Sequence, residues 1–220
     1  MLTKNIKFRE FKIKKNSLKV ENELKKLLRE NNSVIKSLKK NYVNNFQVKK
    51  LSKYKKFLYY RVIGMGGSTL GTQAIYDFLN FKIKKKFTFL DNLSSSKKKI
   101  DKNKHLNLII SKSGNTIETS INSNIFIRKN HTNIFITENN QNHLRKIAEK
   151  LKADIIDHNN FIGGRYSVLS EVGMLPAELM GLDTKKFKQL NSLIKNKNFL
   201  KHLINNVASQ LYFIKKRKYN

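Results

Sequence analysis

The stretch HLNLIISKSGNTIETSINSNIFIRKN, residues 105–130, joins a predicted buried strand to a predicted helix through a loop rich in hydroxyl groups. Residues 105–111 are rich in Leu and Ile, which is typical of a strand buried on both faces of a sheet. Residues 116–130 are predicted to form a helix. A strand followed directly by a helix is half of a βαβ crossover, so this stretch indicates a parallel sheet.

The same alternation of strand and helix extends outward in both directions. Further strands are predicted at residues 56–64, 86–92, 132–139 and 153–159. Further helices are predicted at residues 71–80 and 143–153. This pattern predicts an α/β fold of three layers, in which a five-stranded parallel sheet carries helices on both faces. Ligands of such sheets bind outside the carboxyl ends of the strands, so the loops there are the candidate sites.

The flanking regions are predicted to be mainly helical. Residues 6–15 suggest a short edge strand, and residues 21–46 an amphipathic helix that breaks near Asn31. The only proline, Pro176, suits the first turn of a further helix. Residues 191–220 predict one or two helices that end in a basic stub. We therefore expect three parts, namely an N-terminal extension (1–50), a central domain (51–185) and a helical tail (186–220).

The charge is strongly basic, with 46 Lys and Arg against 15 Asp and Glu, a formal net charge of +31. Only seven of these basic residues are Arg, the side chain that nucleic-acid interfaces favour for its bidentate fork. Abundant Lys, Asn and Ile together indicate a compositional bias and a solvated Lys surface, so no specific nucleic acid is expected as a partner. The charge could still steer an anionic substrate toward a cleft.

Other classes of protein are disfavoured by what the sequence lacks. There is no Cys, which excludes a disulfide scaffold and thiolate chemistry. No apolar run reaches the about 18 residues that would span a bilayer, and the N-terminus has no signal-peptide pattern. A cytoplasmic protein without membrane contact is expected.

The first candidate loop is GMGGSTLG, Gly64 to Gly71, where glycines let a backbone approach a ligand closely. A dinucleotide site is one interpretation, because Gly64 and Gly66 are followed by Asp91 at the end of the next strand. Thr69 occupies the third glycine position, which weakens that interpretation. A Walker A loop is excluded because no Gly-Lys-Ser/Thr follows. A tight strand-to-helix turn is expected in any case.

The second candidate loop is SKSGNTIET, Ser111 to Thr119. Hydroxyl groups, one ammonium and a glycine gather there at a predicted helix start, which suits a phosphate monoester dianion. The alternative is plain helix capping, with Asn115 as the N-cap and Glu118 completing a capping box.

The third candidate loop follows the fifth predicted strand and contains Gly163, Gly164 and Arg165. The glycines allow close backbone approach, and the guanidinium can present its fork to an anion. Three such loops at strand ends of one sheet form a stronger signal than any of them alone.

These motifs together resemble the N-terminal half of the glucose-6-phosphate isomerase family, which is built from two sugar isomerase (SIS) domains. The most specific stretch is FIGGRYSVLSEVGMLPAELMGLD, residues 161–183, and the similarity of motifs begins near residue 62. The chain departs from the family pattern at Glu171, where a small residue is usual. The resemblance implies a three-layer αβα SIS sandwich over residues 51–185.

The resemblance also implies a chemistry, the interconversion of glucose 6-phosphate and fructose 6-phosphate in glycolysis and gluconeogenesis. Arg165 would stabilise the enediolate as the catalytic residue in this chain. The implied substrate-binding residues are Gly67, Ser68, Gly164 and the phosphate clamp of Ser111, Lys112, Ser113 and Thr116. Neither a metal nor an organic cofactor is implied. The implied partner is a sugar phosphate, and full-length members of the family are typically homodimers.

Part of the family's machinery is not found in these 220 residues. The catalytic base is a Glu in a Glu-Ser-x-Gly-Lys-like motif, followed by a ring-opening His and a further Lys, and none of these motifs occurs here. Glu171 and Glu178 lie near the Arg165 loop, with nothing to assign either as the base. The five His residues match no catalytic motif and are predicted to be loop or surface residues: His105, His131, His143, His158 and His202.

We therefore interpret the chain as a fragment of the enzyme, or a half-length product, that supplies the phosphate-binding half of the site and is inactive alone. Two alternatives remain open. One is a stand-alone, non-catalytic phosphosugar-binding SIS module with a regulatory role, and the other is a Lys-rich nucleic-acid binder.

Overall fold

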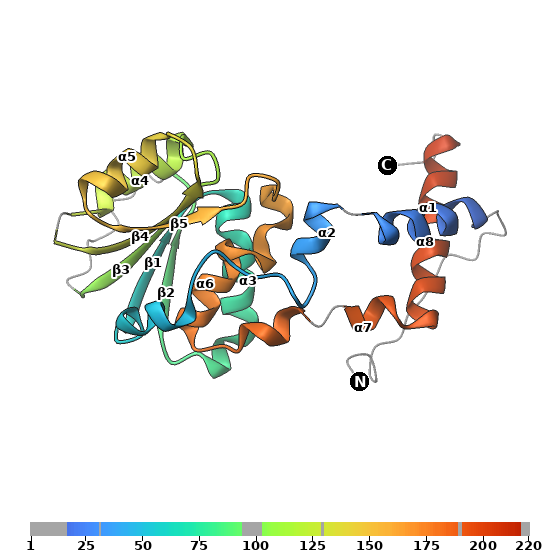
Figure 1. The fold of residues 1–220 in the computed structure, drawn as a ribbon, viewed down its shortest axis with the longest axis horizontal. Coiled ribbons are helices and arrows are strands. Elements are labelled where there is room, and N and C mark those ends of the chain that lie inside the picture. The colour runs from blue at the N-terminus through green and yellow to red at the C-terminus, as the bar shows by residue number, and fades with distance from the viewer. Residues whose placement is uncertain (1–16, 31, 94–102, 129, 189–190, 217–220) are drawn as a thin grey trace. The chain divides into compact units, whose positions relative to one another are not determined.

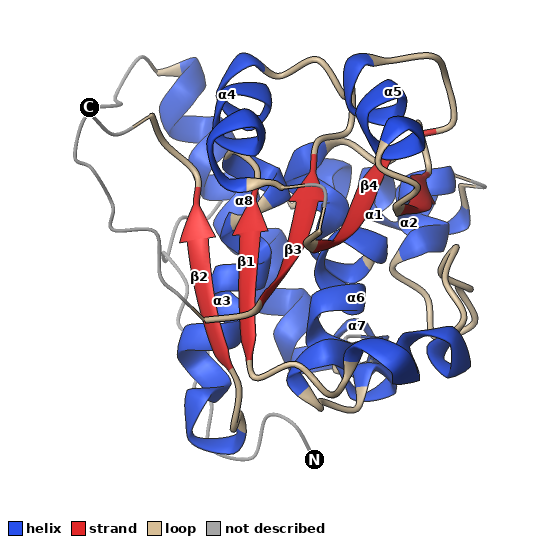
Figure 2. Cartoon of the chain, turned by 90° about the vertical axis from the view of Figure 1, so that its left-hand side faces the viewer, coloured by secondary structure: helices blue, strands red, loops and turns tan. Residues whose placement is uncertain are grey.

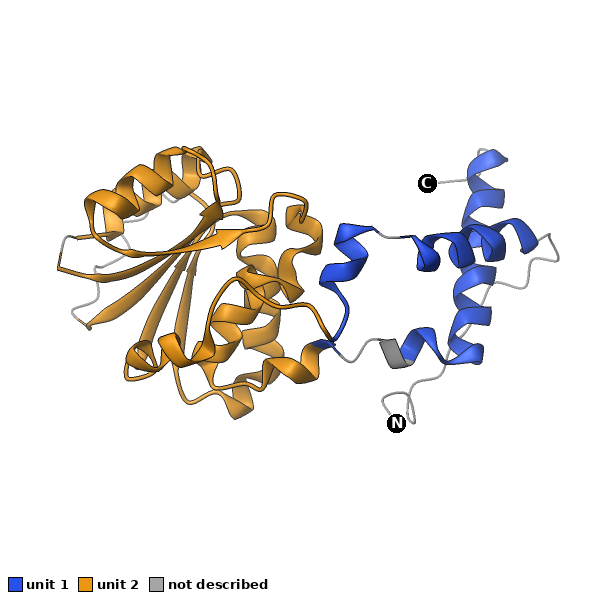
Figure 3. Ribbon diagram, in the orientation of Figure 1, with its two compact units in different colours: residues 1–40, 188–220 blue, residues 41–187 orange. Residues whose placement is uncertain are grey.

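The computed structural model describes residues 17–30, 32–93, 103–128, 130–188 and 191–216. The chain divides into two compact units (Figure 3). One comprises residues 41–187, and the other combines residues 1–40 with residues 188–220. The three-part division expected from the sequence stays a prediction.

The larger unit contains a sheet of five parallel strands in the order β2-β1-β3-β4-β5 (Figure 2). The strands are β1 (Tyr59–Ile63), β2 (Lys86–Leu90), β3 (His105–Ile110), β4 (Thr132–Glu138) and β5 (Asp154–His158). Side chains on both faces of the central strand β3 are buried, as its Leu and Ile content predicts. The prediction of a five-stranded parallel sheet is confirmed.

Helices cover both faces of this sheet (Figure 1). On one face, α4 (Ile117–Phe126) packs on β1 and β3, and α5 (His143–Lys150) packs on β4 and β5. On the other face, α3 (Leu70–Leu79) packs against α6 (Glu171–Met180). The core beneath α4 and α5 includes Ile63, Leu90, Ile109, Phe135 and Leu144. The predicted three-layer α/β sandwich is therefore confirmed.

The connections of β1 and β3 create the place where a ligand is expected. These strands are neighbours, yet β1 leads into α3 on one face and β3 leads into α4 on the other. Such a switch in direction opens a crevice at the carboxyl ends of the two strands, and ligands of doubly wound sheets bind there. The first two candidate loops flank this crevice.

The position of Pro176 differs from the prediction, because it lies in the interior of α6 and not in its first turn. A proline in a helix leaves the carbonyl four residues earlier without its usual N–H donor, here that of Val172. The Thr72 hydroxyl in α3 donates a hydrogen bond of 3.1 Å to that carbonyl. This contact from a neighbouring helix supplies the donor that Pro176 lacks.

Short 3₁₀ segments connect the main elements of the larger unit. They are η1 (Val48–Tyr54), η2 (Gly66–Ser68), η3 (Asn80–Lys82), η4 (Gly164–Leu169) and η5 (Thr184–Lys188), of which the last reaches the unit boundary. Two of them, η2 and η4, carry residues of the first and third candidate loops.

The smaller unit contains α1 (Leu18–Arg29), α2 (Ser33–Ser37), α7 (Asn191–Ile194) and α8 (Lys197–Lys215). The predicted break near Asn31 is confirmed, because the Asn32 side chain caps α2 by accepting bonds from the backbone of Val34 and Ile35. The edge strand predicted at residues 6–15 lies outside the described residues. No helix in the described part of the chain is long and apolar enough to cross a bilayer.

Candidate functional site

The second loop forms a ring of hydroxyl groups at the start of α4. The Ser111 and Thr116 hydroxyls lie 2.9 Å apart, and the Ser111 oxygen also accepts the Gly114 N–H at 3.2 Å. Ser111 is buried, whereas Ser113 is exposed beside it. No side chain of the described residues caps α4, and the first N–H groups of a helix have no intrahelical partner. These groups are donors for an anion.

The alternative interpretation of this helix start, a capping box with Asn115 as the N-cap, is wrong. The N-cap of α4 is Thr116, one residue later than predicted, and Glu118 is therefore the second residue of the helix. The Asn115 side chain instead accepts a hydrogen bond from the His143 N–H at 3.1 Å, at the beginning of α5. Because the Asn115 side chain is bonded to α5, it does not cap α4, and the first N–H groups of α4 have no side-chain acceptor among the described residues.

Backbone hydrogen bonds tie this second loop to the end of β4 and to the start of α5. Gly114 has a φ of +67°, and its carbonyl accepts the Leu144 N–H at 3.0 Å. The Lys112 carbonyl accepts the Glu138 N–H at 3.0 Å. A Cβ on Gly114 would lie 1.9 Å from the Asn142 Oδ1. This bracing fixes the hydroxyl ring before any ligand binds.

Replacing Gly114 with Ala is expected to destabilise the chain by more than about 2 kcal/mol. The left-handed backbone conformation costs roughly 1–2 kcal/mol for a residue with a Cβ, and relieving the overlap with Asn142 adds to that. Gly181→Ala is the matched control, because Gly181 has a φ of +87° and open space around it. Urea unfolding of both variants measures the difference, and equal losses of stability would contradict the proposed packing of Gly114.

The first and third loops touch through their backbones. A Cβ on Gly67 would lie 2.4 Å from the carbonyl oxygen of Gly164, so only glycine permits this approach. The Ser167 hydroxyl lies 3.0 Å from the Gly67 carbonyl and 2.8 Å from that of Gly164, within donating distance of both. Ser68, at the end of η2, is half-buried next to this contact. The structure thus joins two loops that are about 100 residues apart.

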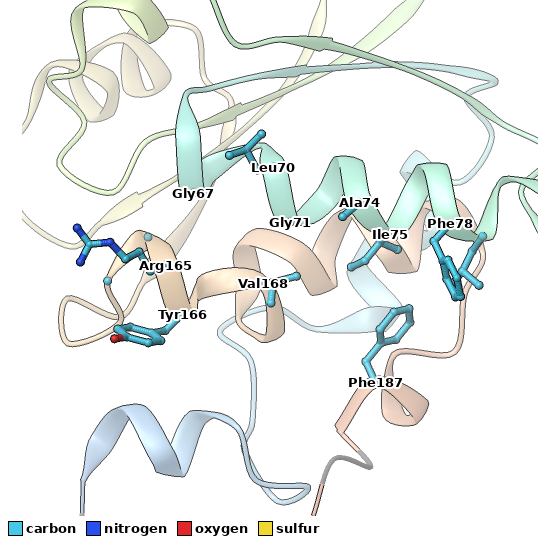
Figure 4. A pocket seen from close by; sticks show the side chains of 13 residues that line it. Gly67, Leu70, Gly71, Ala74, Ile75, Phe78, Arg165, Tyr166, Val168 and Phe187 are labelled. Atoms are coloured by element: carbon cyan, nitrogen blue, oxygen red, sulfur yellow. The ribbon is translucent and has the colours of Figure 1, made fainter. Parts of the chain in front are cut away.

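Arg165 extends from the third loop into solvent beside this contact (Figure 4). Its guanidinium makes no hydrogen bond or ion pair with any residue that the structure describes. An exposed guanidinium with no partner can bind an anion without first breaking an internal ion pair.

The Lys112 ammonium has its partners outside the hydroxyl ring. Its Nζ donates to the Asn160 carbonyl at 2.5 Å and lies 3.4 Å from a Glu138 carboxylate oxygen. Lys112 thereby ties the second loop to the third. The structure brings the predicted site residues together in two groups, the hydroxyl ring and the contact of Gly67 with Gly164, and Lys112 bridges the loops that carry them.

A groove of about 1030 Å³ adjoins the contact of Gly67 with Gly164 (Figure 4). It runs along α3, with Arg165 and Tyr166 at one end and Phe78 and Phe187 at the other. Its lining is mainly apolar, and none of the hydroxyl ring residues takes part in it. The polar part of the candidate site therefore lies beside this groove and not inside it.

The prediction for the histidines is wrong for two of the five. His105 and His158 are buried, on β3 and β5 respectively, and not in loops or at the surface. His158 lies 3.4 Å from the carboxylate of Glu171, which is fully buried. The sequence signal that could have found this pair is the unusual acidic residue at position 171 itself.

The carboxylates of both glutamates of α6 have partners within the fold. Glu178 accepts a hydrogen bond of 2.7 Å from the Thr184 hydroxyl and lies 3.7 Å from the Lys55 ammonium. Glu171 is hydrogen bonded by Tyr42 and by the backbone of Asn45. Among the described residues, no group of three His, Asp or Glu side chains is placed to hold a metal ion.

Comparison with known families gives a match along most of the chain. The family model for phosphoglucose isomerase matches residues 25–210. A glucose-6-phosphate isomerase of Methanocaldococcus jannaschii is 36% identical over 183 residues, covering 74% of this chain and 45% of the relative. One of Mycoplasmopsis pulmonis is 32% identical over 181 residues, covering 71% of this chain and 42% of the relative. The chain spans less than half the length of these curated relatives.

Solved structures share the fold at lower sequence identity. A hypothetical protein from Thermus thermophilus superposes with a TM-score of 0.69 at 22% identity, covering 90% of this chain and 52% of that one. A tagatose-6-phosphate ketose/aldose isomerase from Escherichia coli superposes with a TM-score of 0.50 at 14% identity, covering 66% and 44%. At these identities the likeness shows the fold alone.

Proposed function

The chain belongs to the phosphoglucose isomerase family, and from that premise we propose that its residues 41–187 bind the phosphate and sugar of glucose 6-phosphate or fructose 6-phosphate. This unit would supply one half of an aldose–ketose isomerase site. Members of the family catalyse ring opening and proton transfer between C2 and C1 of the sugar.

The observation that carries the proposal is the uncapped start of α4 at the switch point of the sheet. Three hydroxyls surround it, those of Ser111, Ser113 and Thr116. Hydroxyls and free N–H groups donate hydrogen bonds to phosphate oxygens, and the helix dipole favours a dianion at this end. The brace from β4 and α5 supports the same assignment, because a prearranged ring loses little entropy when a ligand binds.

The contact of Gly67 with Gly164 is proposed to hold the sugar end of the substrate. Exposed backbone and the Ser68 hydroxyl are suited to hydrogen bonds with sugar hydroxyls. Arg165, which has no partner among the described residues, would stabilise the negative charge of an enediolate. No step of this proposal needs a metal or an organic cofactor.

The proton-transfer base is proposed to lie outside these 220 residues. A base must come within hydrogen-bond reach of the C2 proton and carry a free carboxylate. Glu171 is buried with both carboxylate oxygens engaged, and Glu178 is engaged at the far end of α6. The homodimeric assembly of the full-length protein and a cytoplasmic location stay predictions of the family resemblance.

Thr116→Val tests the proposal, because it removes one donor from the hydroxyl ring and keeps the size of the side chain. Fructose 6-phosphate is expected to bind more weakly by roughly 1–3 kcal/mol, about 5- to 150-fold in Kd. Thr88→Val is the matched control, since Thr88 is exposed on β2 and is not part of the candidate site. Calorimetric titration of the three proteins makes the measurement.

If folded Thr116→Val binds fructose 6-phosphate with unchanged affinity, the hydroxyl ring is not the phosphate site. An equal loss in Thr88→Val would point to a general effect on stability. Binding alone does not separate half of an enzyme from a stand-alone phosphosugar-binding module, because both would bind the sugar phosphate.

A further inference from the structure

The buried carboxylate of Glu171 has no role in the proposed binding of substrate. Glu171 is the first residue of α6, and its exposed fraction is 0%. Burying a charge is costly unless hydrogen bonds and an opposite charge accompany it. The partners that Glu171 has acquired therefore indicate what the residue does.

Three donors surround this carboxylate. The Tyr42 hydroxyl and the Asn45 backbone N–H each lie 3.0 Å from Oε1, and the His158 Nδ1 lies 3.4 Å from Oε2. Burial by itself would raise the pKa of the Glu171 carboxyl, but the hydrogen bonds from His158, Asn45 and Tyr42 outweigh it and hold the pKa below its usual value. The group is therefore ionised inside the fold.

The imidazole of His158 connects this carboxylate to the third loop. Its Nε2 lies 3.1 Å from the Ile162 carbonyl, and its Nδ1 faces Glu171. Both ring nitrogens thus face oxygen acceptors. Ile162 is itself fully buried and directly precedes Gly163.

The residues around His158 are anchored to the same segment. The Asn159 side chain donates to the Tyr42 hydroxyl at 2.5 Å, and the Asn45 side chain donates to the Asp157 carbonyl at 2.9 Å. Burial and the charge of Glu171 raise the pKa of Tyr42, so its hydroxyl stays protonated and remains a donor. The segment that leads into the Arg165 loop is therefore held at several consecutive residues.

We propose that Glu171, acting through His158, is a positioning residue that fixes the backbone of Gly163–Arg165 for binding of the sugar. The inference rests on the proposed function. Lys112 holds this loop at the Asn160 carbonyl, and His158 holds it two residues later at the Ile162 carbonyl. The first anchor ties the loop to the hydroxyl ring, and the second ties it to α6. Together the two anchors fix the backbone position from which the Arg165 side chain extends.

Glu171→Gln in the full 220-residue chain is the primary test. The amide keeps the shape of the side chain and removes the charge opposite His158. The affinity for fructose 6-phosphate is expected to fall about tenfold, whereas the affinity for inorganic phosphate, which needs only the hydroxyl ring, is expected to change less than about twofold. Glu178→Gln is the matched control, because Glu178 is an engaged carboxylate at the other end of the same helix.

A double-mutant cycle separates positioning from stability. In an Arg165→Ala background, Glu171→Gln should cost at most about threefold in fructose 6-phosphate affinity, because the group that it positions is already gone. If the affinity losses of Glu171→Gln and Arg165→Ala simply multiplied in the double variant, the inference would be overturned. So would equal losses for fructose 6-phosphate and inorganic phosphate.

Amide hydrogen exchange tests the anchor without any ligand. The amides of Ile162 and Tyr166, which are bonded to Asn159 and Gly163, should lose protection in Glu171→Gln by at least tenfold more than the amides of β3. Parallel losses in loop and sheet would overturn the inference. If Glu171→Gln does not fold, Tyr42→Phe removes one donor to the carboxylate and should give a smaller change of the same pattern. Failure of the wild-type chain to bind fructose 6-phosphate would contradict the proposed function. Hydrogen exchange would still show whether Glu171 and His158 hold the third loop in place.

Discussion

The 220-residue chain alone is expected to isomerise glucose 6-phosphate no faster than buffer does. The hydroxyl ring and Arg165 can bind a sugar phosphate and stabilise an enediolate. An enediolate forms only when a positioned base removes the C2 proton. Losing general base catalysis and the closed cleft that orients the sugar removes many powers of ten in rate.

The contacts of the nearby carboxylates support this expectation. Glu171 is buried and bonded to its neighbours, and Glu178 lies at the end of α6 that is remote from the Arg165 loop. Glu118 is in the first turn of α4, beside the hydroxyl ring. A carboxylate at that place lies next to the phosphate end of the substrate, so it is poorly situated to reach C2.

A coupled assay of purified residues 1–220 makes the measurement, with the full-length isomerase of M. jannaschii as the control for sensitivity. Turnover above background that disappears in Arg165→Ala would contradict the expectation. It would place a base within this chain, and Glu118→Gln would then be the first variant to test.

Gly67→Ala is expected to abolish measurable binding of fructose 6-phosphate, with a loss of affinity of about 100-fold or more. A Cβ at position 67 would lie 2.4 Å from the carbonyl oxygen of Gly164 and 2.6 Å from its Cα. Both are backbone atoms, so no side chain can rotate away. The first and third loops must then separate by about 1 Å, and losing two hydrogen bonds to the sugar at about 1.5 kcal/mol each costs about 100-fold in affinity.

Gly71→Ala is the control for this experiment. A Cβ at Gly71 would lie 2.8 Å from the side chain of Val168, where α3 packs against η4. This contact is with a side chain and not with the backbone of the third loop. Gly71→Ala should lose stability and keep most of its affinity for the sugar phosphate. Folded Gly67→Ala with wild-type affinity would show that the contact of the two loops does not matter for binding.

The architecture could be predicted from the sequence because buried parallel strands have a distinctive composition. The run at residues 105–111 is rich in Leu and Ile, and residues 105–110 form β3, the central strand, which is buried on both faces. Each loop after β1, β3 and β5 contains glycine, and these loops lie where the polar site is assembled. Local patterns therefore sufficed to predict the sheet and the location of its candidate loops.

The features that could not be predicted depend on contacts between distant residues. Pro176 is tolerated inside α6 because Thr72, far away in the sequence, supplies a donor for the Val172 carbonyl. Asn115 and Thr116 are both good N-cap residues, and the choice of Thr116 depends on α5 engaging Asn115. His158 is buried because Glu171 faces it. None of these partners can be identified from local sequence.

Amide chemical-shift mapping of the isotope-labelled chain during titration with fructose 6-phosphate tests most directly whether the start of α4 binds the phosphate. The account predicts that the largest shifts fall on residues 113–119, with further shifts on residues 66–68 and 164–167. Inorganic phosphate should shift the first group alone. Largest shifts along the Lys-rich segment at residues 49–53, or no shifts at millimolar ligand, would contradict the account.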